Sequence, residues 1–198
     1  MQFDFAKDYI LENNRVSLRP LVKGDYHNLK EISNNEPELW KYSLINASGK
    51  ENLKNYIDLA IEAREAGKAY PFIVFDKHKK KYAGSTRFYD FQTIHKTILL
   101  GYTWYGKEFQ QSGLNQNCKY LMLEFVFDKI ELERVEFRAD NKNEQSIKAM
   151  KNLGCTLEGV LRSNLIGLDG RRDSIVFSIL KKEWDSEVRP KLLKKITA

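Results

Sequence analysis

Short segments in which apolar and polar residues alternate predict seven β-strands along the chain. The first is stopped by Pro20, and the next three are separated by turn residues, which is typical of an antiparallel meander. The predicted strands cover residues 15–19, 70–76, 82–89, 96–104, 134–139, 155–162 and 174–180.

Apolar residues spaced three and four positions apart predict four helices between these strands. Asp25 is expected to cap the first helix and Ser48 to begin the second, whereas Gly67 and Gly154 end the second and the fourth. The predicted helices cover residues 25–33, 48–67, 114–126 and 143–152. The third is the clearest, with one apolar stripe made of Leu114, Cys118, Leu121, Met122, Phe125 and Val126.

The order of these elements predicts an α/β fold, a mixed sheet layered with helices. A chain of 198 residues is long enough to bury its own core, and no repeat, low-complexity segment or Pro/Gly-rich linker divides it. We therefore expect one domain over residues 1–198. The longest apolar runs, 72–75 and 175–180, are too short to span a bilayer, and the N-terminal segment has acidic residues where a signal peptide is basic. Both features favour a cytoplasmic protein.

The cysteines and histidines predict neither a disulfide nor a metal site. Cys118 and Cys155 lie in apolar surroundings without CxxC spacing, as expected of a reduced intracellular protein. Cys118 falls on the apolar stripe of a helix, so we expect it in the core rather than as a nucleophile. The histidines are scattered at positions 27, 78 and 95. No metal is expected among the cofactors.

The net charge of +6 raises the alternative of a polyanionic partner. Much of the excess lies in two runs, at residues 77–81 and 189–195, and such runs are more often solvated surfaces. No single predicted element carries lysines interleaved with aromatic residues, as nucleic-acid-binding elements do. We therefore expect no direct nucleic-acid contact, although salt-dependent RNA binding would favour that alternative.

One segment carries specific chemistry, and it joins the strand at 96–104 to the helix at 114–126. It reads GYTWYGKEFQQSGLNQNC over residues 101–118. A glycine at the entry of a helix, here Gly113, lets a phosphate approach the unpaired amides of the first turn and the positive end of the helix dipole. The segment fits neither a Walker loop nor a dinucleotide fingerprint.

Gln110, Gly113 and Asn115 resemble the Q/R-x-x-G-x-G/A signature of the GCN5-related N-acetyltransferases, although asparagine replaces the last small residue. Asn143-Glu144-Gln145-Ser146 is similar to the N-x-x-S signature of the ribosomal-protein alanine and serine acetyltransferases in that family. The resemblance covers roughly residues 15–184. Its further matches are residues 151–155, 157–162, 169–173 and 183–184.

This resemblance implies a GNAT-like mixed, mainly antiparallel sheet in which the family's fourth and fifth strands splay apart around acetyl-CoA. The fourth strand corresponds to residues 96–104, and Asn143 would face the pantetheine arm from the opposite side. The cofactor-binding residues are then Leu100, Gly101, Tyr102, Thr103, Trp104, Gln110, Gln111, Ser112, Gly113, Leu114, Asn115 and Asn143.

The implied reaction is direct attack of a neutral amine on the thioester, with a backbone amide near the fourth-strand bulge stabilising the charge by about 3 kcal/mol. Ser146 is the candidate donor to the leaving sulfur, and it forms the catalytic pair with Asn143; the alternative is that Ser146 only caps or packs in its helix. Met150 replaces the tyrosine of many members, and Leu165 replaces a glutamate of others. The general base is therefore undetermined.

The missing base favours an acceptor whose amine loses its proton easily. At pH 7 deprotonation costs roughly 1 kcal/mol for an α-amine and roughly 5 kcal/mol for lysine. We expect a protein N-terminus, with Glu36, Glu38 and Asp90 as acids that would attract a basic ribosomal tail. The candidate substrate-binding residues are Trp40, Tyr42, Arg87 and Tyr89, with core packing as the alternative for Trp40 and Tyr42.

Two other functions remain open at this stage. The chain could be a non-catalytic acyl-CoA-binding module, or an acetyltransferase for a polyamine, antibiotic or other small amine. The expected partners are acetyl-CoA and an amine acceptor, the chain acting as a monomer or homodimer without a membrane.

Overall fold

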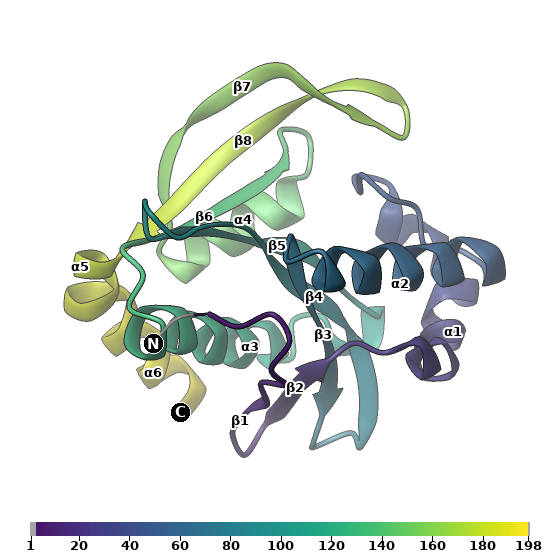
Figure 1. Cartoon of the computed structure of the whole chain (residues 1–198), viewed down its shortest axis with the longest axis horizontal. Helices are drawn as coiled ribbons and strands as arrows, with labels where there is room; N and C mark the ends of the chain where they lie inside the picture. The colour runs from purple at the N-terminus through teal and green to yellow at the C-terminus, as the bar shows by residue number, and fades with distance from the viewer. Residues whose placement is uncertain (1–2, 198) are drawn as a thin grey trace.

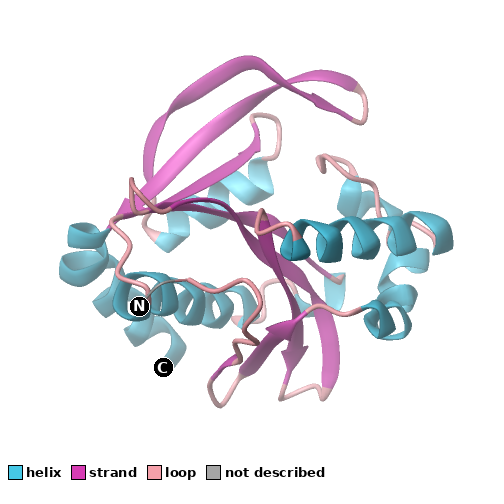
Figure 2. Cartoon of the chain, in the orientation of Figure 1, coloured by secondary structure: helices cyan, strands magenta, loops and turns pink. Residues whose placement is uncertain are grey.

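The computed structural model describes residues 3–197, and its strands form one mixed sheet with helices on both faces (Figures 1 and 2). The spatial order is β1-β2-β3-β4-β5-β6-β8-β7, and β5–β6 is the parallel pair. The strands are β1 (Leu11–Glu12), β2 (Val16–Pro20), β3 (Ala69–Asp76), β4 (Lys81–Gln92), β5 (Thr97–Tyr105), β6 (Arg134–Asp140), β7 (Thr156–Gly167) and β8 (Gly170–Leu180). The predicted mixed and mainly antiparallel sheet is confirmed.

The helices divide between the two faces of the sheet and bury two separate apolar clusters. α1 and α2 pack on one face around Leu29, Trp40 and Leu53, whereas α3, α4 and α6 contribute to the larger cluster on the other face. The helices are α1 (Tyr26–Asn35), α2 (Lys50–Glu65), α3 (Leu114–Glu124), α4 (Glu144–Leu153), α5 (Lys181–Glu183) and α6 (Arg189–Thr197). No helix in this described part of the chain is long and apolar enough to cross a membrane.

The starts of two helices differ in detail from the prediction. Asp25 is the N-cap residue of α1, as predicted, but its carboxylate accepts hydrogen bonds from the Val22 amide and from Arg19 and makes no capping bond to the helix. α2 begins at Lys50 after Gly49, so Ser48 lies outside it. Side-chain capping is only one of several competing partners for a short polar residue.

Two elements at the ends of the chain do not follow from the sequence pattern. β1 pairs with β2 but is only two residues long, which is too short for a periodic pattern. The basic run at 189–195 forms α6, in which Leu192 is buried against the core while the lysines face solvent. Trp184 precedes this helix and is fully buried, stacked on Phe127 with ring centroids 5.8 Å apart.

The β7–β8 hairpin extends beyond the rest of the sheet and arches over one side of it (Figure 1). β7 is an edge strand, and its pairing with β8 is interrupted between Leu161 and Leu165. Within that interruption the Ser163 amide donates to the Asp173 carboxylate at 2.7 Å. The hairpin is therefore bent, and near its tip Arg172 contacts Tyr42, in the segment between α1 and α2.

Candidate active site

The strands β5 and β6 pair only along their first three residues and then separate. The parallel register runs from Thr97 opposite Arg134 to Leu99 opposite Glu136. From Leu100 onward the β6-facing edge of β5 carries backbone groups that no strand pairs with. Such an edge can hydrogen-bond an extended ligand in place of a strand. This is the splay that the resemblance implied, and residues 100–104 lie along it.

A β-bulge lies at the beginning of this unpaired segment. Ser85 pairs with Trp104 and Arg87 with Gly101, so β5 has one more residue than β4 between these pairs. Tyr102 takes up the extra length with a φ of +49°. A bulge bends its strand and redirects backbone groups, which places it among the local features that shape a site.

The loop after β5 leads into α3 through two residues with left-handed backbone conformation. Gln111 has a φ of +57° and Gly113, the residue before the helix, a φ of +80°. A Cβ on Gly113 would meet no atom within 4 Å, so the space above it is open. The glycine is therefore required by the backbone and leaves room for a ligand to approach.

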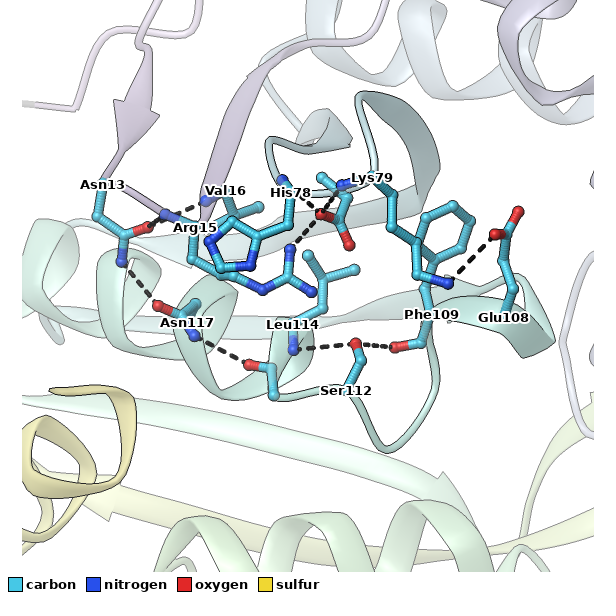
Figure 3. A network of polar contacts seen from close by, with 12 residues as sticks. Asn13, Arg15, Val16, His78, Lys79, Glu108, Phe109, Ser112, Leu114 and Asn117 are labelled. Atoms are coloured by element: carbon cyan, nitrogen blue, oxygen red, sulfur yellow. Dashed lines mark hydrogen bonds and ion pairs between the residues drawn. The ribbon is translucent and has the colours of Figure 1, made fainter. Parts of the chain in front are cut away.

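Hydrogen bonds within the chain hold this loop in shape (Figure 3). The Ser112 hydroxyl donates to the Phe109 carbonyl at 2.6 Å and accepts from the Leu114 amide at 3.4 Å. The Asn117 side chain donates to the Gly113 carbonyl at 3.0 Å and accepts from Asn13 at 2.9 Å. The predicted residues Ser112 and Leu114 thus serve the loop's own geometry.

The same network continues to the start of β2 and to the β3–β4 turn (Figure 3). Asn13 accepts from the backbone amides of Arg15 and Val16, and Arg15 forms an ion pair with buried Asp76. Asp76 also accepts from the amides of His78 and Lys79 at 2.9 Å. Burial alone would raise the pKa of the Asp76 carboxyl group, but the ion pair and these hydrogen bonds together lower it. The loop is thus connected to several strands at once, which limits its motion.

Gln110 links the loop to α4 across the splay. Its side chain donates to the Tyr105 carbonyl at 3.0 Å and accepts from Gln145 at 2.9 Å. Gln110 therefore connects the loop after β5 to α4, a role that the motif alone did not indicate.

The start of α3 fits an anionic group. Among the described residues, the backbone amides of Gly113, Asn115 and Gln116 have no hydrogen-bond partner, and the helix dipole adds positive potential at the same point. The Asn115 side-chain oxygen is also buried without a partner. The three backbone amides, rather than any lysine or arginine of the loop, would hold the pyrophosphate of acetyl-CoA, because they are donors whereas the Asn115 oxygen is an acceptor.

Lys119 is a buried residue beside β5 that sequence reasoning missed. Its side chain comes from α3, is 6% exposed, and donates from Nζ to the Thr103 hydroxyl at 2.9 Å. Burial lowers the pKa of Lys119 to about 8. A lysine among apolar neighbours on a predicted helix, one position after Cys118, was the available signal.

The two predicted catalytic residues lie at the start of α4 and make different contacts there. Asn143 is the N-cap of α4, and its side-chain oxygen accepts from the Ser146 amide at 3.0 Å. The Ser146 hydroxyl makes no hydrogen bond to any described residue and is partly exposed. The capping role thus belongs to Asn143, which leaves the Ser146 hydroxyl available for chemistry.

Neither cysteine is suited to be a nucleophile. Cys118 is fully buried and burial raises the pKa of its thiol to about 12, as it does for Cys155. A thiolate is therefore strongly disfavoured at both positions. The expected core position of Cys118 is confirmed.

On the opposite face of the sheet, Arg87, Tyr89 and Tyr102 lie beside α2. The Arg87 guanidinium stacks on the rings of Tyr56 and Tyr102, 4.9 Å and 4.2 Å from their centroids. The rings of Tyr89 and Tyr102 meet edge to face at 5.1 Å, and burial raises the pKa of the Tyr89 hydroxyl. Two of the predicted substrate-binding residues, Arg87 and Tyr89, are thus brought together beside the bulge.

The other two predicted substrate-binding residues, Trp40 and Tyr42, lie in the segment between α1 and α2 and contact β5 and the β7–β8 hairpin. Trp40 is 1% exposed and packs on Trp104 with centroids 5.4 Å apart, which matches the core-packing alternative. The Tyr42 carbonyl accepts a hydrogen bond from Arg172 of the β7–β8 hairpin at 3.0 Å. A groove of about 440 Å³ lies where Trp40 and Leu168 of the hairpin meet. A larger hollow, about 1170 Å³, lies at the far end of α2 and is lined by none of the predicted site residues.

The predicted acidic mouth is not assembled. Glu36 accepts from the Lys107 amide at 2.8 Å, near the end of β5, whereas Asp90 lies at the opposite end of β4 with Gln92. Residues six positions apart on a strand are roughly 20 Å apart, and β4 runs from Gly84, opposite Tyr105, to Asp90 across this distance. The expectation that these acids act together is wrong.

Comparisons with known proteins agree with this geometry. The chain is 26% identical over 187 residues to "Putative ribosomal N-acetyltransferase YdaF" of Bacillus subtilis (strain 168), covering 88% of this chain and 96% of that protein. It is 30% identical to a solved "putative acetyltransferase" from T. thermophilus, with a TM-score of 0.85 over 94% of this chain and 96% of that one.

A structure of a ribosomal-protein-S5-alanine acetyltransferase from Vibrio fischeri shares the fold, with a TM-score of 0.71, 20% identity and coverage of 89% of this chain and 99% of that one. The sequence profile described as "Acetyltransferase (GNAT) domain" matches residues 15–156, which is most of the chain. The chain therefore belongs to the GNAT acetyltransferase family and is an N-acetyltransferase.

Proposed function

We propose that this enzyme transfers the acetyl group of acetyl-CoA to the α-amine of a protein or peptide N-terminus. Acetyl-CoA is the cosubstrate of the family and supplies the activated acetyl thioester. In the proposal the free edge of residues 100–104 holds the pantetheine arm, the amides at the start of α3 hold the pyrophosphate, and the acceptor approaches from the α1–α2 face.

The main support for the proposal is that the Glu136 carboxylate, which lies on β6 where β5 and β6 separate, is already hydrogen-bonded. Both of its oxygens accept hydrogen bonds from arginines, from Arg134 at 2.9 Å and from Arg138 at 2.6 Å. A carboxylate engaged at both oxygens is poorly placed to take a proton from an amine. Met150 is buried and Leu165 lies on β7, so neither position supplies a base. In the proposal the acceptor amine therefore loses its proton without help from these three positions.

An α-amine meets this condition because its pKa is near 8, whereas that of a lysine amine is near 10.4. After attack, the proton bound for the leaving sulfur would come from the Ser146 hydroxyl, which no described residue engages. A ribosomal protein N-terminus is one acceptor of this kind, as the name of the B. subtilis relative suggests. We place the reaction in the cytoplasm, carried out by the chain as one domain.

The test compares two peptides of one sequence that differ only in which amine is free. One has a free N-terminus and an acetylated lysine; the other has a blocked N-terminus and a free lysine. We expect the first to be the better substrate at pH 7 by at least about tenfold, with kcat/KM rising with pH and levelling off near 8. Mass spectrometry locates the new acetyl group. Modification mainly on lysine, or on small amines alone, contradicts the proposal but not the acetyltransferase activity.

A further inference from the structure

The acceptor side of the sheet contains a buried arginine that has no polar partner for much of its guanidinium group. Arg87 is 3% exposed, and its Nε and Nη2 are buried without a hydrogen bond. No described residue forms an ion pair with it. Arginine stays protonated at all ordinary pH values, and a buried unpaired charge is strongly unfavourable. The chain itself therefore leaves these two donors of Arg87 unsatisfied.

Two tyrosines fix the plane of the guanidinium group but do not satisfy its donors. Tyr56 from α2 and Tyr102 from β5 both present ring faces to it, at 4.9 Å and 4.2 Å. The Tyr56 hydroxyl also contacts the Tyr102 carbonyl at 3.5 Å. Ring faces attract the cation, yet the Nε and Nη2 donors at the edge of the guanidinium plane remain unused. That edge matches the geometry of a carboxylate.

Neighbouring unpaired groups on this face are also donors. The indole N–H groups of Trp40 and Trp104 are buried without partners. Trp104 contacts Trp40 at 5.4 Å and Tyr56 at 6.1 Å, so these residues and Arg87 form one connected cluster. A cluster whose unsatisfied groups are N–H donors attracts an anion and repels a cation.

The carboxylate of Glu136 on β6 does not fill this role. Glu136 is engaged by Arg134 and Arg138, and Arg138 and Arg172 add positive charge around Tyr89. Glu36 and Asp90 are bound at opposite ends of β4. The charges on this face thus leave Arg87 without an internal counter-ion among the described residues.

The location of Arg87 places the anion with the acceptor rather than with acetyl-CoA. Arg87 pairs with Gly101, next to the Tyr102 bulge, and lies on the α2 face. Its neighbour Thr86 points the other way and contacts Thr103, which receives the Lys119 bond on the α3 face. The phosphate-binding amides lie at the start of α3, also on that second face.

We propose that Arg87 binds a carboxylate on the acceptor, so that the preferred peptides carry aspartate or glutamate at their first or second position. This specificity rests on the proposed N-terminal acetylation. A carboxylate at either position lies within a few bonds of the α-amine and can reach Arg87 while the amine lies at the bulge. Basic acceptors such as polyamines are disfavoured by the same charge.

The experiment uses three matched pairs of peptides, beginning Ser-Glu and Ser-Gln, Ala-Asp and Ala-Asn, and Asp-Ala and Asn-Ala, with the full-length enzyme. We expect kcat/KM to be at least about tenfold higher for the acidic member of each pair. In Arg87→Gln this ratio should fall to about twofold or less, and Arg87→Lys should retain only part of it, because an ammonium cannot form the bidentate contact. Arg162→Gln, an exposed position on β7, is the control and should retain the full ratio.

Acetyl-CoA affinity by calorimetry shows whether each variant is folded. If Arg87→Gln does not fold, the wild-type ratio and Arg87→Lys decide. Equal rates for acidic and neutral peptides, or a ratio unchanged in either variant, would overturn the role of Arg87 and leave N-terminal acetylation intact. Transfer to small amines and to no peptide would overturn both.

Discussion

Each face of the sheet buries a cationic side chain beside β5, Lys119 on the α3 face and Arg87 on the α2 face. The two side chains differ in whether the chain supplies their hydrogen-bond partners. On the α3 face Lys119 donates to Thr103, which in turn contacts Thr86 at 2.7 Å. On the α2 face Arg87 is stacked between tyrosines with two nitrogens unpaired. The first cation has a hydrogen-bond partner within the chain, and the second lacks one for these two nitrogens.

In the proposed function, this difference separates acetyl-CoA, the ligand that the family shares, from the acceptor, the ligand that would distinguish its members. Acetyl-CoA would be bound mainly by backbone, through the free edge of β5 and the amides at the start of α3, in a loop that the chain's own hydrogen bonds hold. The acceptor would be bound by side chains whose donors are still unpaired. A binding site built from backbone groups needs few particular residues. In a binding site built from side chains, the specificity depends on each residue.

The largest expected effect tests the backbone-built side. Gly113→Glu would place a carboxylate in the open space above the first turn of α3, where the phosphates would lie, and would strain a backbone with φ of +80°. We expect acetyl-CoA affinity to fall by more than about 100-fold in calorimetry, since charge and volume both oppose binding.

Gly49→Glu is the matched control for this change. Gly49 also precedes a helix, has a φ of +81°, and would meet no atom within 4 Å. Its ψ of 170°, against -10° at Gly113, makes a side chain there at least as strained. Gly49 lacks the predicted ligand, so its acetyl-CoA affinity should stay near that of the wild type if the variant folds. A similar loss in both variants would point to helix destabilisation instead.

The next effect concerns Lys119 and the pH dependence of stability. Its pKa is lowered from 10.5 to about 8 in the folded state, so between these values the unfolded chain binds the extra proton and folding becomes more favourable as pH rises. Below pH 8 the cost of burying the charge is complete. Lys119→Met removes that cost, which corresponds to roughly 3 kcal/mol.

Denaturant unfolding of both proteins at several pH values measures this difference. The stability gained by Lys119→Met should be largest at pH 7 and shrink by roughly 3 kcal/mol on going to pH 10.5. Lys151→Met, at an exposed position of α4, should show a difference that does not change with pH. A constant difference for Lys119 as well would mean that its ammonium is solvated in the folded protein.

Sequence patterns predict the frame of the molecule better than its charges. Long hydrophobic patterns predict an element correctly even when tertiary contacts favour another conformation locally. Examples are the strands at 70–76 and 96–104 and the helix beginning at Leu114. β1 and α6 escape prediction because one is two residues long and the other is dominated by lysines, whose pattern indicates only solvation. The family signature locates the loop at 110–115 because backbone geometry there requires glycine.

The partners of the charged residues could not be assigned from sequence because pairing and burial depend on how the folded elements pack. The sequence predicts Asp25 as a helix cap, but Arg19 and the Val22 amide engage it. Lys119 differs from other helical lysines only in its apolar neighbours, and Arg87 is expected near the substrate without any indication that it is unpaired. A sequence shows which side chains can carry charge and leaves open which of them lack a counter-ion.

The smallest effect tests whether Ser146 contributes to chemistry or only to the structure of α4. The Asn143 side chain caps the helix through the Ser146 amide, and this bond survives when the hydroxyl is removed. Ser146→Ala should therefore keep the melting temperature of the wild type. If the hydroxyl donates a proton towards the leaving sulfur, kcat should fall roughly 10- to 100-fold while the KM for acetyl-CoA changes little, since the group acts mainly in the transition state.

Ser186→Ala is the control, because that hydroxyl is also helical and bonds only the Lys182 carbonyl. Steady-state kinetics at saturating acceptor distinguish the two roles. An equal kcat in Ser146→Ala and the wild type would assign Ser146 to structure and leave protonation of the thiolate to solvent.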